Sequence, residues 1–405
     1  MIKKIVLLGV SLALTLGALE VSMRIFRPVG SECQPAFRMD ETIGWVWAPD
    51  QHGFIYQMNY AAPEIFRSKF ETNSLGMRDR EYAFEKNGKL RVLALGDSFT
   101  QGWGVEEQEA FPKVLESQFL QDVEVWNLGV VGYSTDQELE LLRKTIAKAK
   151  PDLVVLAFYE NDIADNTRAQ SLWYPRYKKP LFELRGDGPA LSNEDELIRQ
   201  KRIAEQQSAS IFGRFHDVLM SSAVLRLARF SIRKMLYARA LGSRRDLEAE
   251  VWGRNNAYRI AQTEEMKRAW ALTEGLLVEV SQLCEQHGTH LVVTYIPRAL
   301  EIVPGILEAE LQKFHSADTA SAFDLAMPER TLAEVTARRG IRFVEMRNTF
   351  LATPHPESLY LPEILRDGHL SAAGQFLVAQ TLAEHLRGQD LLPTKRFSAW
   401  RHGAW

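Results

Sequence analysis

The stretch Arg91–Gly102 constrains the fold of this 405-residue chain more than any other. Its first half, RVLALG, is a short apolar run that ends at a glycine, which is typical of a buried strand in a parallel sheet. Between Glu106 and Phe119 the apolar residues recur at helical spacing. Ser98 therefore falls in the turn between the carboxyl end of a strand and the next helix, where open α/β sheets bind their ligands.

Three later segments supply the partners that a nucleophilic serine needs, a base and fixed donors for an oxyanion. The predicted strand 123–127 leads into Gly132, where the backbone can approach a ligand closely. The predicted strand 152–158 ends shortly before Asn161, which offers a side-chain amide. Near the C-terminus, His369 precedes a helical pattern and is the candidate base.

The order of these segments resembles the four blocks of the SGNH, or GDSL-type, hydrolases. The blocks are Gly96-Asp97-Ser98, a glycine after the second strand, Asn161-Asp162 after the third, and a late Asp/His pair. The resemblance covers roughly residues 91–162 and 263–388. Segments similar to residues 34–89 of this chain precede the serine block in membrane-anchored members of the family.

The resemblance implies a role for each candidate site residue. Ser98 is implied as the nucleophile and His369 as the general base, with Asp367 orienting the histidine. The oxyanion hole is implied to consist of the backbone N–H groups of Ser98 and Gly132 and the side chain of Asn161. No cofactor is implied, because acyl transfer through serine needs none.

Two positions depart from the family pattern. The third block usually has glycine two positions before the asparagine, where this chain has Tyr159. The last block commonly places the aspartate three residues before the histidine, but that position is Arg366 and the aspartate is Asp367. An Asp-x-His spacing is more similar to the polysaccharide O-acetyltransferase branch, in which a sugar hydroxyl replaces water as acyl acceptor.

Strands and helices alternate through the remaining sequence of the core. Strands are predicted at 291–296 and 341–345, and helices from about Thr263 and over 327–338. This alternation predicts a three-layer α/β/α sandwich with a parallel sheet, of the flavodoxin-like kind.

The sequence divides into five parts. They are an N-terminal anchor (1–28), an extension of strands and turns (34–89), the hydrolase domain (90–162 and 263–390), a mostly helical insertion (163–262) and a C-terminal tail (391–405). For the insertion, we weigh a cap packed on the domain against a lid on a membrane or on an acidic polysaccharide, because residues 218–241 interleave apolar and basic side chains.

The N-terminus carries the apolar run Ile5–Leu19 after two lysines. This pattern predicts either a membrane anchor or an export signal. We prefer an uncleaved anchor, because no Ala-x-Ala-like cleavage site follows; secretion after cleavage is the alternative. In both cases the catalytic part is expected outside the cytoplasm, in the periplasm or at the cell surface.

Charge and composition exclude several partners. The net charge of −3 gives no basic footprint, so we expect no nucleic acid partner, and the nine histidines show no metal-ligand spacing. Cys33 and Cys284 are compatible with a disulfide or with a buried thiol at Cys284. The oligomeric state stays open.

We therefore expect a serine esterase that acts on O-acetyl or other acyl esters of cell-surface or exported polysaccharide. Trp103, Trp173 and Tyr174 are candidates for stacking on sugars or for the core. A polysaccharide O-acetyltransferase with the same Ser/His pair, and a non-catalytic glycan-binding or assembly protein, are the alternatives. Lipid esters also remain open as substrates.

Overall fold

The computed structural model describes most of the chain, and every structural statement below concerns that part. The described residues are 2–26, 35–58, 65–86, 88–120, 122–171, 174, 176–186, 188–240, 255–313, 318–361, 368–389 and 391.

A five-stranded sheet forms the centre of the molecule. Its strands are β5 (Leu90–Gly96), β6 (Val123–Asn127), β7 (Leu153–Phe158), β10 (His290–Tyr295) and β11 (Arg342–Val344). They lie in the order β11-β10-β7-β5-β6, and every neighbouring pair is parallel. The predicted parallel sheet is thereby confirmed.

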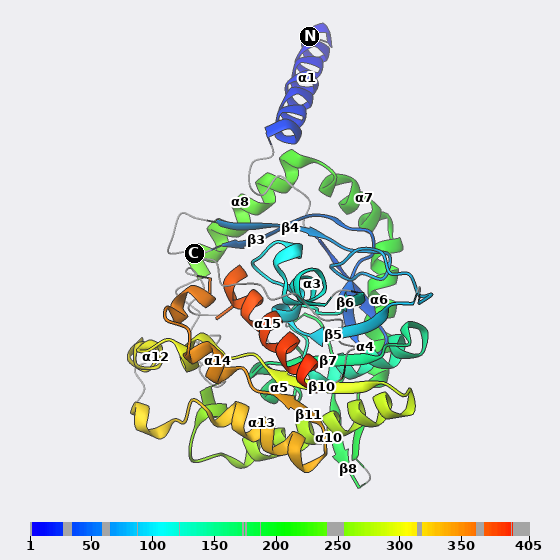
Figure 1. The fold of residues 1–405 in the computed structure, drawn as a ribbon. Coiled ribbons are helices and arrows are strands. Elements are labelled where there is room, and N and C mark those ends of the chain that lie inside the picture. The colour runs from blue at the N-terminus through cyan, green and yellow to red at the C-terminus, as the bar shows by residue number, and fades with distance from the viewer. Residues whose placement is uncertain are drawn as a thin grey trace.

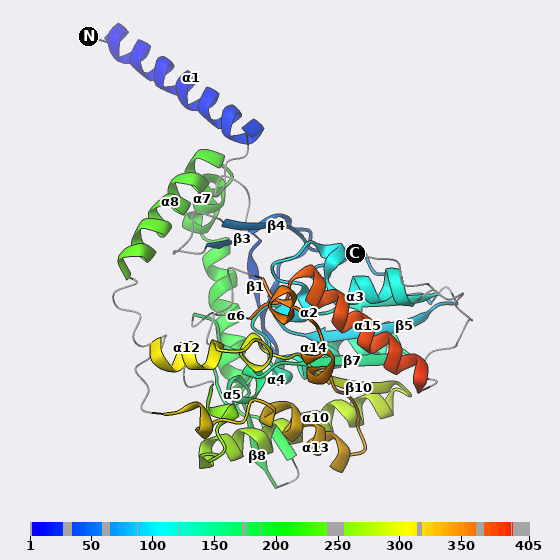
Figure 2. The same cartoon turned by 60° about the vertical axis from the view of Figure 1, so that its left-hand side comes forward.

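Helices cover both faces of this sheet, as expected for parallel strands buried on both sides. One face packs against α4 (Thr135–Ala149), α10 (Glu264–Gln286) and α13 (Met327–Arg338), and the other against α3 (Phe111–Val114) and α15 (Ala372–Gly388). Figure 2 shows the sheet between α15 and α10. The three-layer prediction is correct.

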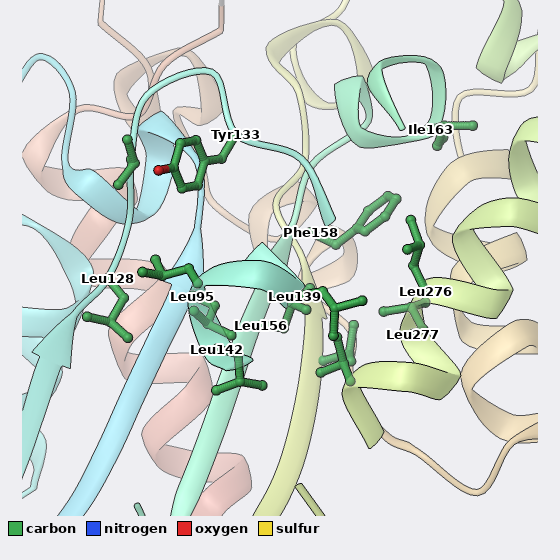
Figure 3. Packing of buried hydrophobic residues seen from close by; sticks show 14 of the residues in the cluster. Leu95, Leu128, Tyr133, Leu139, Leu142, Leu156, Phe158, Ile163, Leu276 and Leu277 are labelled. Atoms are coloured by element: carbon green, nitrogen blue, oxygen red, sulfur yellow. The ribbon is translucent and has the colours of Figure 1, made fainter. Parts of the chain in front are cut away.

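The alternation of side chains along each strand builds the two cores. In β5, Leu93 and Leu95 belong to one hydrophobic cluster, whereas Val92 and Ala94 belong to the other. Figure 3 shows the first cluster, in which leucines of α4 and α10 pack over the strands. The strand ends are thereby fixed by packing on two sides.

The N-terminal extension forms two antiparallel pairs. They are β1 (Phe37–Asp40) with β2 (Gly44–Trp47), and β3 (His52–Met58) with β4 (Ile65–Glu71). The indole Nε1 of Trp47 donates to Oε1 of Gln101 over 2.8 Å, directly behind the turn that carries Ser98. The extension therefore packs against the core next to the carboxyl end of β5.

The insertion after β7 contains both strands and helices. It comprises α5 (Asn161–Asp165), the antiparallel pair β8 (Phe182–Arg185) and β9 (Gly188–Leu191), α6 (Glu194–Ala209), α7 (Ile211–Met220) and α8 (Ala223–Ala240). The apolar and basic sequence at 218–241 is divided between two helices, because the chain turns at Ser221 and Ser222.

Shorter helices complete the fold. The α-helices are α2 (Ser98–Gln101), α11 (Ala299–Ile302), α12 (Ile306–Lys313) and α14 (Arg347–Leu351). The 3-10 helices are η1 (Glu107–Glu109), η4 (Asn255–Tyr258), η5 (Ala320–Ala322) and η6 (Pro356–Leu359), and η2 (Leu115–Phe119) is a π-helix that continues α3.

The N-terminal apolar run is part of the helix α1 (Ile2–Phe26), which projects from the rest of the molecule (Figure 1). It has 25 residues, a mean hydropathy of 2.0 over its most apolar window, and no part of that window is buried. These properties fit a membrane anchor or a signal sequence.

Candidate active site

Ser98 is the first residue of α2, at the carboxyl end of β5. The side chain of Asp97 caps this helix, since its Oδ1 accepts a hydrogen bond of 2.8 Å from the Phe99 N–H. The cap fixes the turn and presents Ser98, which is buried with 6% of its surface exposed.

His369 reaches Ser98 from a loop 271 residues further along the chain. Its Nε2 atom lies 2.8 Å from Ser98 Oγ, within the range required for proton transfer. The His369 carbonyl accepts a 3.0 Å hydrogen bond from the Leu361 N–H, and Ser371 caps α15 directly behind the loop. The structure thus brings the predicted nucleophile and base together, whereas Asp367 and Arg366 lie outside the described residues.

An aromatic stack supports the histidine ring. The rings of Phe99 and His369 are stacked with centroids 4.8 Å apart. The ring of Tyr159 packs on that of Phe99, with a centroid distance of 4.2 Å. Tyr159 therefore fills the space beneath this stack, which accounts for a large side chain where the family usually has glycine. The sequence did not predict this role of Phe99, because a ring contact with a residue 270 positions away leaves no local pattern.

The loop after β6 lies over α2. The Val130 N–H donates to the Gly96 carbonyl over 3.1 Å, and the Val131 N–H donates to Gln101 Oε1 over 3.0 Å. Gly132 has φ +75°, a conformation that favours glycine. Within the described part of the chain no hydrogen bond engages its N–H, which fits the predicted oxyanion donor.

Asn161 opens α5 after β7 and is 2% exposed. Its Nδ2 donates to the Tyr133 carbonyl over 3.5 Å and to Asp165 Oδ2 over 3.3 Å. Both hydrogen bonds are long and therefore weak. The amide is held beside the Gly132 loop by two weak hydrogen bonds, which a stronger acceptor such as an oxyanion could replace.

We expect Asn161→Ala to lower kcat about 10²- to 10³-fold on an ester substrate, the usual effect of losing one oxyanion donor. The residual rate should stay above that of Ser98→Ala. Initial rates with p-nitrophenyl acetate measure this effect, with Asn348→Ala as a control on the more exposed helix α14. Equal rates for Asn161→Ala and wild type would remove Asn161 from the oxyanion hole.

A group of buried carboxyl groups lies behind the site. Glu138 on α4 is 1% exposed, and neither of its carboxyl oxygens has a hydrogen-bond partner among the described residues. Burial raises the pKa of Glu138 well above its ordinary value, and the negative charges of Asp97 and Asp136 raise it further. Burial, together with Glu138 and Asp97, likewise raises the pKa of Asp162. Both shifts favour the protonated, neutral form of these carboxyl groups and so limit the negative charge behind the site.

The raised pKa of Glu138 predicts a pH dependence of stability. The folded state binds this proton more tightly than the unfolded state, so the free energy of unfolding falls as pH rises from the unfolded pKa of 4.5 towards the folded pKa. Glu138→Gln stays neutral and should be about 1–3 kcal/mol more stable than wild type at pH 8, with a smaller difference at pH 5.

Urea unfolding at the two pH values measures this difference, with Glu205→Gln on the exposed face of α6 as control. The control should change stability by no more than about 0.5 kcal/mol. An unfolding free energy of wild type that rose between pH 5 and 8 relative to Glu138→Gln would contradict the assignment.

Arg78 of the N-terminal extension holds the end of α2 and is 1% exposed. Its guanidinium donates to the carbonyls of Gly102 (2.6 Å), Lys69 (2.8 Å), Val105 (2.9 Å) and Gln101 (3.3 Å). Burial lowers the pKa of Arg78 to about 10, so the group stays charged at neutral pH. One side chain thus joins the extension to the segment behind the nucleophile.

The remaining candidates have different surroundings. Trp103 is half-buried, with its ring centroid 6.4 Å from that of His369. Tyr174 packs against Gly132, and its ring centroid lies 5.0 Å from that of Phe37, so it belongs to an aromatic cluster. Trp173 and Cys33 lie outside the described residues, and Cys284 is a free buried thiol.

Comparison with known protein families gives a match over part of the chain. Residues 94–210 match the model of the GDSL-like Lipase/Acylhydrolase family, a span that contains Ser98, Gly132 and Asn161. No curated protein matches the chain.

Two solved structures illustrate the similarity. A GDSL-like lipase from Bacteroides thetaiotaomicron is 12% identical, with a TM-score of 0.37 over 76% of this chain and 93% of that one. A lipase/acylhydrolase from Enterococcus faecalis is 13% identical, with a TM-score of 0.37 over 74% of this chain and 96% of that one.

Proposed function

We propose that this chain, whose residues 94–210 match the model of the GDSL-like lipase/acylhydrolase family, is a serine esterase that acts outside the cytoplasm on acyl esters of cell-surface or exported polysaccharide. The observation that carries the proposal is the 2.8 Å contact between His369 Nε2 and Ser98 Oγ. O-acetyl groups are the proposed acyl groups.

The reaction follows from this pair. His369 takes the proton of Ser98 as Oγ attacks the ester carbonyl, and the resulting oxyanion is stabilised by the N–H groups of Ser98 and Gly132 and by the Asn161 amide. Collapse of the tetrahedral intermediate breaks the bond to the sugar oxygen, which receives the proton from His369. Water then attacks the acyl-Ser98 by the same steps in reverse. In this proposal Asp367 orients His369.

Two features support the substrate and the location. Trp103, half-buried beside His369, offers an aromatic surface next to the reacting atoms, and such surfaces pack well against the apolar faces of sugars. Lys3 and Lys4 precede the apolar run of α1, and positive charge favours a cytoplasmic N-terminus for a spanning helix. With this orientation the rest of the chain would lie on the opposite side of the membrane.

The test follows the fate of the acetyl group. The full chain, solubilised in detergent, is given p-nitrophenyl acetate and, separately, an O-acetylated polysaccharide, each with and without a deacetylated glycan as acceptor. Acetate released to water from the polysaccharide supports the proposal. Transfer to the glycan in place of release would make the protein an acetyltransferase.

The controls are Ser98→Ala and Ser117→Ala, the latter an exposed serine on η2. Release that depends on Ser98 and not on Ser117 is expected. Turnover of p-nitrophenyl acetate without release of acetate from any polysaccharide would reject polysaccharide as the substrate but would leave the esterase activity in place.

A further inference from the structure

The end of α1 is joined to the insertion by a set of hydrogen bonds. The Glu20 carboxylate accepts from Ser222 Oγ (2.8 Å) and from the N–H groups of Ala223 (2.9 Å) and Val224 (3.2 Å), so it caps the start of α8. Arg24 donates to the Ser221 carbonyl over 3.0 Å. Figures 1 and 2 both place α7 and α8 beside the end of α1 from which the chain continues.

These two helices expose large apolar side chains. On α7, Phe212 is 81% exposed and Phe215 is 61% exposed, and on α8 Ile232 is 53% exposed. Other exposed apolar residues of the pair are Ile211, Leu219, Leu225 and Met235. Exposed large apolar side chains gathered on two adjoining helices point to a site of interaction with a membrane or a protein.

The same segment is basic. Residues 211–240 contain six arginines and lysines and one acidic residue, Asp217, although the whole chain carries a net charge of −3. Arg214 and Arg229 are exposed. Arg226 has a structural role, because its Nη1 donates to the carbonyls of Met220 (2.8 Å) and Ser221 (2.9 Å) at the turn between the helices.

We propose that α7 and α8 lie in the membrane interface next to α1, with their apolar side chains among the acyl chains and their cations at anionic lipid headgroups. Exposed apolar residues interleaved with arginines have the composition of helices that lie in this interface. The hydrogen bonds of Glu20 and Arg24 hold the pair where α1 would leave the bilayer. An acidic polysaccharide would account for the cations but not for exposed phenylalanines.

The proposal assigns the insertion a role in orientation. A single spanning helix would leave the catalytic domain free to rotate about its connection, whereas a second contact through α7 and α8 restricts that rotation. The inference rests on the anchor part of the proposed function and is independent of the catalytic part.

The test uses the wild-type full chain in vesicles of phosphatidylcholine and phosphatidylglycerol that contain a lipid with a photoreactive diazirine on its acyl chain. After irradiation, mass spectrometry locates the labelled residues. We expect label on α1 and on the exposed apolar residues of α7 and α8. Leu184 serves as the matched control, since it is 50% exposed and belongs to β8, a strand at the opposite end of the molecule from α1 (Figure 1). It should stay at background.

Each other outcome overturns the proposal. If α1 were labelled while α7 and α8 carried no more label than Leu184, the interfacial position of α7 and α8 would be rejected and the membrane anchor would be kept. Absence of label from α1 as well would reject both, with esterase activity unaffected. Protection of residues 211–232 from amide exchange by an acidic polysaccharide, without lipid label, would assign this surface to the polymer.

Discussion

Replacing Ser98 by alanine is expected to lower kcat on p-nitrophenyl acetate about 10⁴- to 10⁶-fold, because the acyl-enzyme route then has no nucleophile. Among the described residues, the Ser98 hydroxyl makes its hydrogen bond with His369 Nε2, over 2.8 Å. Removing the hydroxyl should therefore leave the fold unchanged. Rates are measured at saturating substrate, and thermal unfolding confirms that the variant is folded.

Ser117→Ala is the matched control for this substitution, because Ser117 is exposed and its hydroxyl donates only within its own helical turn, to the Lys113 carbonyl. Its kcat should equal that of wild type. A Ser98→Ala enzyme with more than about a tenth of the wild-type rate would show that another group attacks the ester.

Replacing Arg78 by methionine is expected to lower the free energy of unfolding by about 3–5 kcal/mol, the largest effect on stability that we anticipate. Methionine fills much of the same space but donates no hydrogen bond. The carbonyls of Lys69, Gly102 and Val105 would then be left buried without this donor. Urea unfolding measures the loss.

Arg80→Met provides the control two residues away. The Arg80 side chain is 43% exposed and forms an ion pair of 2.8 Å with Glu116, and surface pairs of this kind contribute at most about 1 kcal/mol. Similar losses for the two variants would mean that Arg78 contributes no more than a surface arginine. A lower kcat in Arg78→Met that persists at low temperature would indicate that the segment behind Ser98 has moved.

The sheet was predictable because each strand is marked by a local pattern. The run that ends at Gly96 is β5, and the nearly continuous apolar run before Tyr159 is β7. In parallel strands covered on both faces the side chains are mostly buried, and those of β7 all are, so apolar runs of this kind are a strong signal. The helix predicted at 327–338 has the bounds of α13. The expected resemblance to the GDSL-type family is also confirmed, over residues 94–210.

Contacts between distant segments left weaker signals. Arg78 resembles an ordinary surface arginine in sequence, and only the fold reveals that it donates to carbonyls of β4 and of the segment at the end of α2. Glu138 lies on a helix rich in charged residues, where a carboxylate is normally expected to face solvent, and yet it is buried. The turn at Ser221 and Ser222 was hidden by an apolar pattern that continues on both sides.

In the candidate site, too, some residues could be predicted from the sequence and others could not. Block order alone pointed to Ser98 and His369, which the fold places in contact. Gly132 and Asn161 could be named from their places after strands, and their oxyanion role stays a prediction. The support of His369 by Phe99 and Tyr159 depends on ring packing, for which no sequence period exists.

The most direct test of the central claim is covalent trapping of the nucleophile with a fluorophosphonate, followed by mass spectrometry of the intact protein and of its peptides. We predict one adduct per wild-type chain, on the peptide that contains Ser98, and none on Ser98→Ala. An adduct on a different residue, or a wild-type chain that stays unlabelled while it hydrolyses p-nitrophenyl acetate, would contradict catalysis through an acyl-Ser98 intermediate.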